Sequence, residues 1–402
     1  MKRNRFFVVG ILFALVALAL QAAISAGEDV ADTPTPVSVG EKIFADRGLS
    51  ASGDLACATC HDPANAHAQT NDFPVQSGGA NGDMPGFRAV PSLRYLSFTP
   101  RFHFDDEGTP VGGFNRDGRA DDLMAQAIRP LFAPHEMANE SVAALAARLA
   151  RAPYADEFKR VFGAQVFDDE DATLRAVLFA LAQYEKLDPD FRPFDSKYDE
   201  FLRGHVRLEP AELRGLALFN RADKGNCAAC HPSHRGANGE LPLFTDFSYD
   251  NLGVPRNPRI PATADPDYFD LGLCGPDRTD LSERSDLCGA FKVPTLRNVA
   301  TRRVFFHNGR FTTLRDALRF YVRRDTDPAL FYPQDASGNV RKFDDLPPEL
   351  AANVNAVEVP YDRKPGETAR LTEAELADLE AFLNTLTDGY SLPKGNPEPT
   401  QR

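Results

Sequence analysis

Residues 57–61 read Cys-Ala-Thr-Cys-His, and residues 227–231 read Cys-Ala-Ala-Cys-His. This pattern is that of c-type haem attachment, in which two thioethers hold the porphyrin and the histidine binds the iron. A zinc site built from the two Cys-x-x-Cys pairs is the main alternative, but both pairs carry the trailing histidine. The sequence therefore predicts two covalently bound haem c groups. The predicted thioether positions are Cys57, Cys60, Cys227 and Cys230, and the predicted proximal iron ligands are His61 and His231.

Residues 1–26 have the pattern of a secretory signal peptide. Lys2, Arg3 and Arg5 precede an apolar stretch from Phe6 to Leu20, and small residues follow it. The alternative is an uncleaved anchor, but the apolar stretch is shorter than the ~20 residues that a membrane span needs. We expect no stable span once the signal is removed. Because haem c is attached after export, the predicted location is the bacterial periplasm.

The chain is acidic, with a net charge of −13 that becomes −16 when the three positive charges of the signal are removed. This charge argues against nucleic acid as a partner. The length suits two domains. We expect an N-terminal haem domain over residues 27–200 and a C-terminal one over 201–402, because Pro189 and Pro193 break the helical pattern near residues 190–208.

Similar phrases precede the two haem motifs, Gly-Glu-Lys-Ile-Phe at 40–44 and Gly-Leu-Ala-Leu-Phe at 215–219. Each is predicted to be the helix that packs on a haem. Further helices are expected at 141–151, at 171–186, and after a capping box of Thr372 and Glu375. Residues 62–118 and 232–293 are rich in glycine, proline and aspartate. The predicted fold is mainly α, with two cytochrome-c-like haem domains and long wrapping loops.

Cys274 and Cys288 are the remaining cysteines. In an oxidising compartment we expect them to form a disulfide that closes a 15-residue loop, worth on the order of 3 kcal/mol. A pair of free thiols is the alternative.

The second haem lacks a methionine from its own half of the chain. The methionines are Met1, Met84, Met124 and Met137, all before Cys230. Downstream candidates for the sixth ligand are His234, His307 and several tyrosines. Thr313 can cap a helix on which Leu314, Leu318 and Tyr321 share one face, although a core tyrosine would fit the same pattern.

For the first haem, His67, His103 and Met84 are candidate sixth ligands, unless the site is open for chemistry. Gln126 and Glu136 beside an open haem would form a peroxide pocket, because a carboxylate can move a proton between the peroxide oxygens. Taken alone, residues of these types more often lie on a helix surface.

These motifs together resemble the bacterial dihaem cytochrome c peroxidase/MauG family. The resemblance rests on the two Cys-x-x-Cys-His motifs, Asp117-Gly118-Arg119-Ala120, Gln126, Pro134-His135-Glu136-Met137, the run 293–299, and His307-x-Gly309. It implies an N-terminal haem on His61 that is open to hydrogen peroxide, with Glu136 as the acid/base and Gln126 lining the pocket. It also implies a six-coordinate haem on His231, with Tyr321 as its distal ligand.

Conventional peroxidases of this family have methionine at that distal position, and MauG-like members have tyrosine. The resemblance therefore implies a MauG-like enzyme, in which a bis-Fe(IV) state oxidises a residue of a periplasmic protein substrate. Arg94-Tyr95 and residues 101–104 further resemble the MbnH-like branch. The alternatives are a peroxidase that takes electrons from a small cytochrome or copper protein, and a non-enzymatic dihaem electron carrier.

Three positions depart from the family. Arg116 stands where the family has a tryptophan between the haems, and this chain has no tryptophan. This leaves the bis-Fe(IV) state open. At the interdomain calcium site, Ala89, Arg302 and Val304 replace family residues; Arg302 opposes a divalent cation, although backbone carbonyls could still bind one. His67 replaces an aromatic residue, and is expected either to ligate the resting iron or to be exposed.

Overall fold

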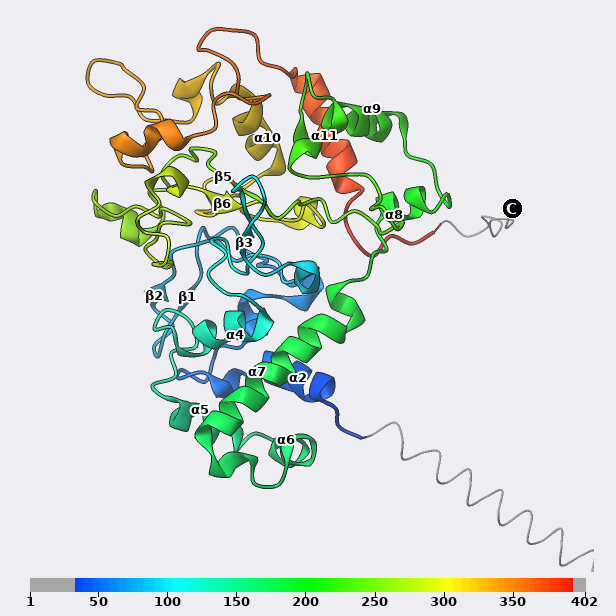
Figure 1. Ribbon diagram of the computed structural model, residues 1–402, viewed down its shortest axis with the longest axis vertical. Coiled ribbons are helices and arrows are strands. Elements are labelled where there is room, and N and C mark those ends of the chain that lie inside the picture. The colour runs from blue at the N-terminus through cyan, green and yellow to red at the C-terminus, as the bar shows by residue number, and fades with distance from the viewer. Residues whose placement is uncertain (1–32, 393–402) are drawn as a thin grey trace, which may run out of the picture.

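The computed structural model describes residues 33–392 (Figure 1). The predicted signal peptide, residues 1–26, lies outside this range. Between residues 33 and 392, no helix is both long enough and apolar enough to cross a membrane.

The secondary structure is mainly helical, as the sequence predicted. The α-helices are α2 (Pro36–Ala45), α3 (Cys57–Cys60), α4 (Leu123–Phe132), α5 (Val142–Leu149), α6 (Ala155–Phe162), α7 (Glu170–Leu187), α8 (Lys197–Leu202), α9 (Pro210–Asn220), α10 (Leu314–Arg323) and α11 (Glu373–Asn384). Short 3₁₀ helices are η2 (Arg47–Leu49), η3 (Pro63–Asn65), η4 (Leu96–Phe98), η5 (Val166–Asp168), η6 (Pro189–Phe191), η7 (Cys227–Ala229), η8 (Pro261–Ala264), η9 (Ser285–Leu287), η10 (Val299–Thr301), η11 (Pro328–Leu330) and η12 (Pro348–Asn353).

The strands in the described residues form three antiparallel pairs of two residues per strand. They are β1 (Ser77–Gly78) with β2 (Met84–Pro85), β3 (His103–Phe104) with β4 (Pro110–Val111), and β5 (Tyr249–Asp250) with β6 (Phe291–Lys292). All three pairs fall in or beside the two loop-rich segments.

Side-chain caps fix where the predicted helices begin. The hydroxyl of Ser141 accepts from the amide of Ala144 at the start of α5. At the start of α11, Thr372 and Glu375 form the predicted capping box. Such caps satisfy amides that have no partner within the helix.

The helix before each haem motif packs on the last long helix of the same half, α2 on α7 and α9 on α11 (Figure 1). A glycine makes each crossing possible. A methyl group on Gly40 would overlap the carbonyl oxygen of Ala180, and one on Gly215 would overlap that of Asp378. This close approach explains why both predicted phrases begin with glycine.

The described residues form two large hydrophobic cores and a small third cluster of Phe114, Ala120, Leu123 and Ala182. The N-terminal core runs from Val39 to Phe191, and the C-terminal core from Tyr198 to Leu386. The last residue of the N-terminal core is Phe191, and the first of the C-terminal core is Tyr198.

Candidate haem and peroxide sites

Each Cys-x-x-Cys-His motif lies at the wall of its own cavity. The N-terminal cavity, about 210 Å³, is lined by Cys57, Cys60 and His61. The C-terminal cavity, about 320 Å³, is lined by the equivalent residues of the second motif.

A backbone carbonyl orients each motif histidine. Nδ1 of His61 lies 3.3 Å from the carbonyl oxygen of His67, and Nδ1 of His231 lies 2.8 Å from that of Phe244. Because a carbonyl can only accept, Nδ1 carries the proton and Nε2 keeps its lone pair for a metal. Burial lowers the pKa of His61 to about 4 and also lowers that of His231. Both imidazoles are therefore neutral at physiological pH, the state that can bind a metal.

The same five-residue pattern supports both histidines, a repeat that was not predicted from the sequence. Residues 90–94 read Val-Pro-Ser-Leu-Arg, and residues 293–297 read Val-Pro-Thr-Leu-Arg. The amide of Leu93 donates to the carbonyl of His67 (3.2 Å), and the amide of Leu296 donates to the carbonyl of Phe244 (3.3 Å). Each carbonyl that orients a motif histidine is thus held in place by this pattern.

The donor sets fit haem c. Two cysteines and a neutral, oriented histidine stand at each cavity wall, and the C-terminal cavity is lined mainly by apolar side chains. Burial raises the pKa of all four thiols, to about 11 for Cys60. Because the thiolate is the reactive form, these thiols are poor nucleophiles in the folded chain.

The structure places both predicted peroxide-pocket residues on the N-terminal cavity. Gln126 projects from α4, and Glu136 follows that helix in the turn that the β1–β2 hairpin contacts. The amide of Gly79 donates to the carbonyl of Glu136 (2.8 Å), which fixes the turn. The Glu136 side chain is 38% exposed, so protons can reach it from solvent.

Two further polar residues on this wall were not predicted. Nε2 of His135 lies 3.5 Å from Oε1 of Glu136, and its position next to Glu136 in the sequence was an available signal. Glu185, on α7, is buried, has one carboxyl oxygen without a partner, and has its pKa raised to about 8 by burial. Sequence periodicity marks Glu185 only as a helix residue.

The alternative sixth ligands for the first haem do not line the cavity. His103 is exposed, and Met84 is 45% exposed. The expectation that His67 is exposed is wrong, and its side chain does not line the N-terminal cavity. Its side chain is fully buried and stacks on Phe191 with ring centroids 3.9 Å apart. Its carbonyl contacts Nδ1 of His61. This nitrogen is on the opposite side of the imidazole from Nε2, the predicted iron-binding atom.

In the second half, Tyr321 reaches the same cavity as His231. Thr313 caps α10 by accepting from the amide of Asp316, and Leu314 and Leu318 line the cavity beside Tyr321. Burial raises the pKa of Tyr321, with smaller contributions from Cys227 and Asp250. The ring of Tyr361 lies 6.1 Å from that of Tyr321 on the same wall.

The histidine alternatives are placed less favourably. His234 is exposed and lies off the cavity. His307 lines the cavity but stacks flat on Phe291, with ring centroids 3.8 Å apart, and its Nε2 lies 3.8 Å from Asp345.

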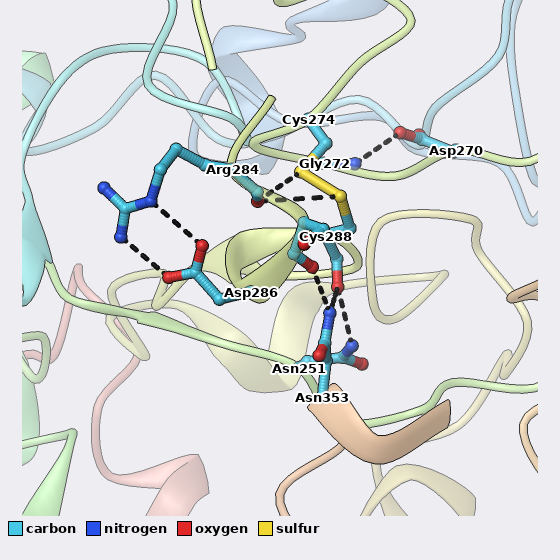
Figure 2. The surroundings of a disulfide bond; sticks show 9 residues. Asn251, Asp270, Gly272, Cys274, Arg284, Asp286, Cys288 and Asn353 are labelled. Atoms are coloured by element: carbon cyan, nitrogen blue, oxygen red, sulfur yellow. Dashed lines mark hydrogen bonds and ion pairs between the residues drawn. A yellow bond between two sulfur atoms is a disulfide. The ribbon is translucent and has the colours of Figure 1, made fainter. Parts of the chain in front are cut away.

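Cys274 and Cys288 form a disulfide with Cα atoms 5.0 Å apart (Figure 2). The Cys288 carbonyl accepts from the side-chain amides of Asn251 and Asn353, each at 3.1 Å. The bridge closes the loop that leads into β6, which carries Phe291 and Lys292 along the C-terminal cavity.

Comparison with known proteins agrees with this architecture. Residues 34–207 match the family described as di-haem cytochrome c peroxidase. The chain is 36% identical over 360 residues to the methylamine utilization protein MauG of Paracoccus denitrificans (strain Pd 1222), covering 87% of this chain and 88% of that protein.

Two solved structures are also similar. The diheme peroxidase BthA from Burkholderia thailandensis E264 superposes with a TM-score of 0.81 at 40% identity, covering 88% of this chain and 86% of that chain. A MauG-like protein associated with microbial copper homeostasis superposes with a TM-score of 0.62 at 25% identity, covering 92% and 95%. The chain belongs to the dihaem cytochrome c peroxidase/MauG family. It is therefore a haem peroxidase-family enzyme that acts on hydrogen peroxide.

Proposed function

We propose that this protein is a MauG-like peroxidase, which uses hydrogen peroxide to oxidise a residue on a partner protein. The observation that carries the proposal is Tyr321, which stands in the cavity of His231 while all four methionines precede Cys230. A methionine ligand raises a haem potential and suits the entry of electrons from a small cytochrome. An anionic phenolate favours higher oxidation states instead.

The N-terminal cavity is the proposed site of peroxide reduction. The haem there would exchange electrons with peroxide. Glu136 would take the proton from the inner peroxide oxygen and deliver it to the outer one, so that the O–O bond breaks heterolytically. The Gln126 amide would orient the peroxide. His135, 3.5 Å from Glu136, is placed to return protons to that carboxyl.

The reaction balances with the partner as the reductant. Hydrogen peroxide takes up two electrons and two protons and yields two molecules of water. The partner residue loses two electrons and, in the simplest case, two protons. In this proposal the two predicted domains have different roles. The domain before residue 200, which contains Glu136, reacts with peroxide. The domain after it, which contains Tyr321, holds the second haem, which shares the oxidising equivalents.

The proposed setting is the periplasm. Its support is the pattern of residues 1–26, the need for haem attachment after export, and the Cys274–Cys288 disulfide, which is typical of oxidising compartments.

Conventional peroxidase activity is the second candidate, because the similar BthA structure is described as a diheme peroxidase. A reduced small c-type cytochrome, used as a probe donor, separates the two. We expect the wild type to oxidise this donor slowly and Tyr321→Met to oxidise it faster. Rapid steady-state turnover by the wild type, with no gain in the variant, would support the conventional cycle.

A further inference from the structure

Three cationic side chains, Arg116, Lys292 and Arg302, gather where the two cavities approach each other. Arg116 lines both cavities, and Lys292 and Arg302 line the C-terminal one. Arg302 also lowers the pKa of His61, so its charge reaches the N-terminal site. We call these three residues the inter-cavity cations.

The inter-cavity cations bind backbone carbonyls rather than carboxylates. The Arg116 guanidinium donates to the carbonyl of Ala89 at 3.0 and 3.1 Å, and Arg302 donates to that of Val90 at 2.7 Å. The Lys292 ammonium donates to the carbonyl of Gly113. Within residues 33–392, no carboxylate lies at ion-pair distance from any of the three.

The carboxylates that interact electrostatically with the inter-cavity cations already form ion pairs with another arginine. Asp270 raises the pKa of Arg116, and Asp117 raises that of Lys292. Arg88 holds both aspartates, at 2.6 Å each. Lys292 is in β6, where it pairs with Tyr249 of β5.

The cations are therefore incompletely compensated by protein charges. Burial lowers the pKa of Arg116 to about 9, of Lys292 to about 7 and of Arg302 to about 10. A buried charge without an opposite charge is costly. The arrangement favours an anionic group in the cavities and disfavours a divalent cation at the Ala89 and Val90 carbonyls.

We propose that the inter-cavity cations bind the propionate carboxylates of the two haems, with Arg116 contacting a carboxylate from each. This inference rests on the two haem sites and not on the proposed oxidation of a partner, so the two can fail separately. Arg116 would then link the haems electrostatically at the position where the family has a tryptophan, a residue type that this chain lacks.

The test is the midpoint potential of each haem, measured by spectroelectrochemical titration. Thioethers keep both haems attached in the variants. A nearby cation stabilises the less positive ferrous state, so Arg116→Gln should lower both potentials. Lys292→Gln should lower mainly that of the C-terminal haem, whereas Arg302→Gln should lower both, because the charge of Arg302 also acts on His61. Arg116→Lys should retain most of the wild-type values. As a control, Arg319→Gln, an ion-paired and 42% exposed arginine on α10, should change neither.

Unchanged potentials in Arg116→Gln, or a change confined to one haem, would overturn the proposal. Wild-type potentials that move with added inorganic phosphate would indicate a free anion in place of the haem carboxylates. A change of the ferric spectra on treatment with EDTA would indicate a metal ion there.

The unmodified protein offers a second test, should a variant fold poorly. The resonance Raman bending modes of the carboxylates should shift in deuterated water if guanidinium groups donate to them, and the absence of any shift would contradict the proposal.

Discussion

His67 and Phe244 occupy equivalent places in the two halves of the chain. Each carbonyl accepts from Nδ1 of a motif histidine and from the amide of a leucine in the Val-Pro-x-Leu-Arg pattern. Both residues have positive φ angles, 53° and 54°, which non-glycine residues seldom adopt. The side chain of His67 therefore packs in the core as a phenylalanine would, and its backbone carbonyl orients the imidazole of His61.

This equivalence predicts that His67→Phe keeps the haem ligation of the wild type. It removes two buried ring nitrogens that lack partners, so we expect the free energy of unfolding at pH 7 to rise by about 1–3 kcal/mol. Denaturant unfolding measures this change, and the ferric spectrum measures the ligation. An altered spin state of the N-terminal haem would contradict the structural role.

The same substitution should reduce sensitivity to acid. Burial, with help from Arg94 and His61, lowers the pKa of His67 to about 3, against about 6.5 in an unfolded chain. Between these values the unfolded chain binds a proton that the folded chain excludes. The free energy of unfolding therefore falls with decreasing pH, by up to about 1.4 kcal/mol per pH unit.

His67→Phe should lose this component between pH 6.5 and 3. His103→Phe, at an exposed position, is the matched control and should retain it. Parallel pH profiles for the wild type and His67→Phe would show that His67 does not titrate in this way.

Glu136→Gln should keep both haems bound and slow the reaction with peroxide by about 10²–10⁴-fold, the usual value of general acid–base catalysis. Stopped-flow absorbance after mixing with peroxide measures the rate. Glu140→Gln, at a side chain 65% exposed, is the control and should react like the wild type. Equal rates for Glu136→Gln and the wild type would remove Glu136 from the mechanism.

Tyr321→Phe should change the spectrum of the C-terminal haem alone, because the variant lacks the phenolate oxygen. Visible and EPR spectra of the ferric protein measure the change. Tyr332→Phe provides the comparison, since that hydroxyl donates to the carbonyl of Gly253 instead. If Tyr321→Phe leaves the spectra unaltered, another residue such as His307 is the ligand.

Gly40→Ala and Gly215→Ala should each destabilise one half of the chain. The added methyl groups would overlap the carbonyls of Ala180 and Asp378, and overpacking of this kind costs about 1–3 kcal/mol. Thermal unfolding followed by circular dichroism tests the effect. Glu41→Ala, on the exposed face of α2, should have little influence. Wild-type stability in both glycine variants would mean that the helices can move apart without cost.

The sequence predicted the features that depend on short-range patterns. The haem motifs, the Thr372 capping box and the helical face of Leu318 and Tyr321 are all encoded within a few residues, and the structure contains them. Gln126 and Glu136 share a cavity wall, although placing them there required a family resemblance.

Long-range relationships were not accessible in the same way. The role of His67 depends on Leu93 and Phe191, which are distant in sequence. The Val-Pro-x-Leu-Arg repeat is visible in the sequence, but its role depends on carbonyls that are distant in sequence. The amide of Leu93 binds the carbonyl of His67, 26 residues away, and the amide of Leu296 binds that of Phe244, 52 residues away. The inter-cavity cations come from three separate segments of the chain, so only the folded chain brings their charges together.

The most direct test of MauG-like chemistry is the EPR and optical spectrum of the ferric protein before and after one equivalent of peroxide, with no electron donor. We predict one high-spin and one low-spin haem, which pass to a long-lived oxidised state without the ferric EPR signals. Two low-spin haems that ignore peroxide until one of them is reduced would contradict the account and indicate a conventional cytochrome c peroxidase cycle.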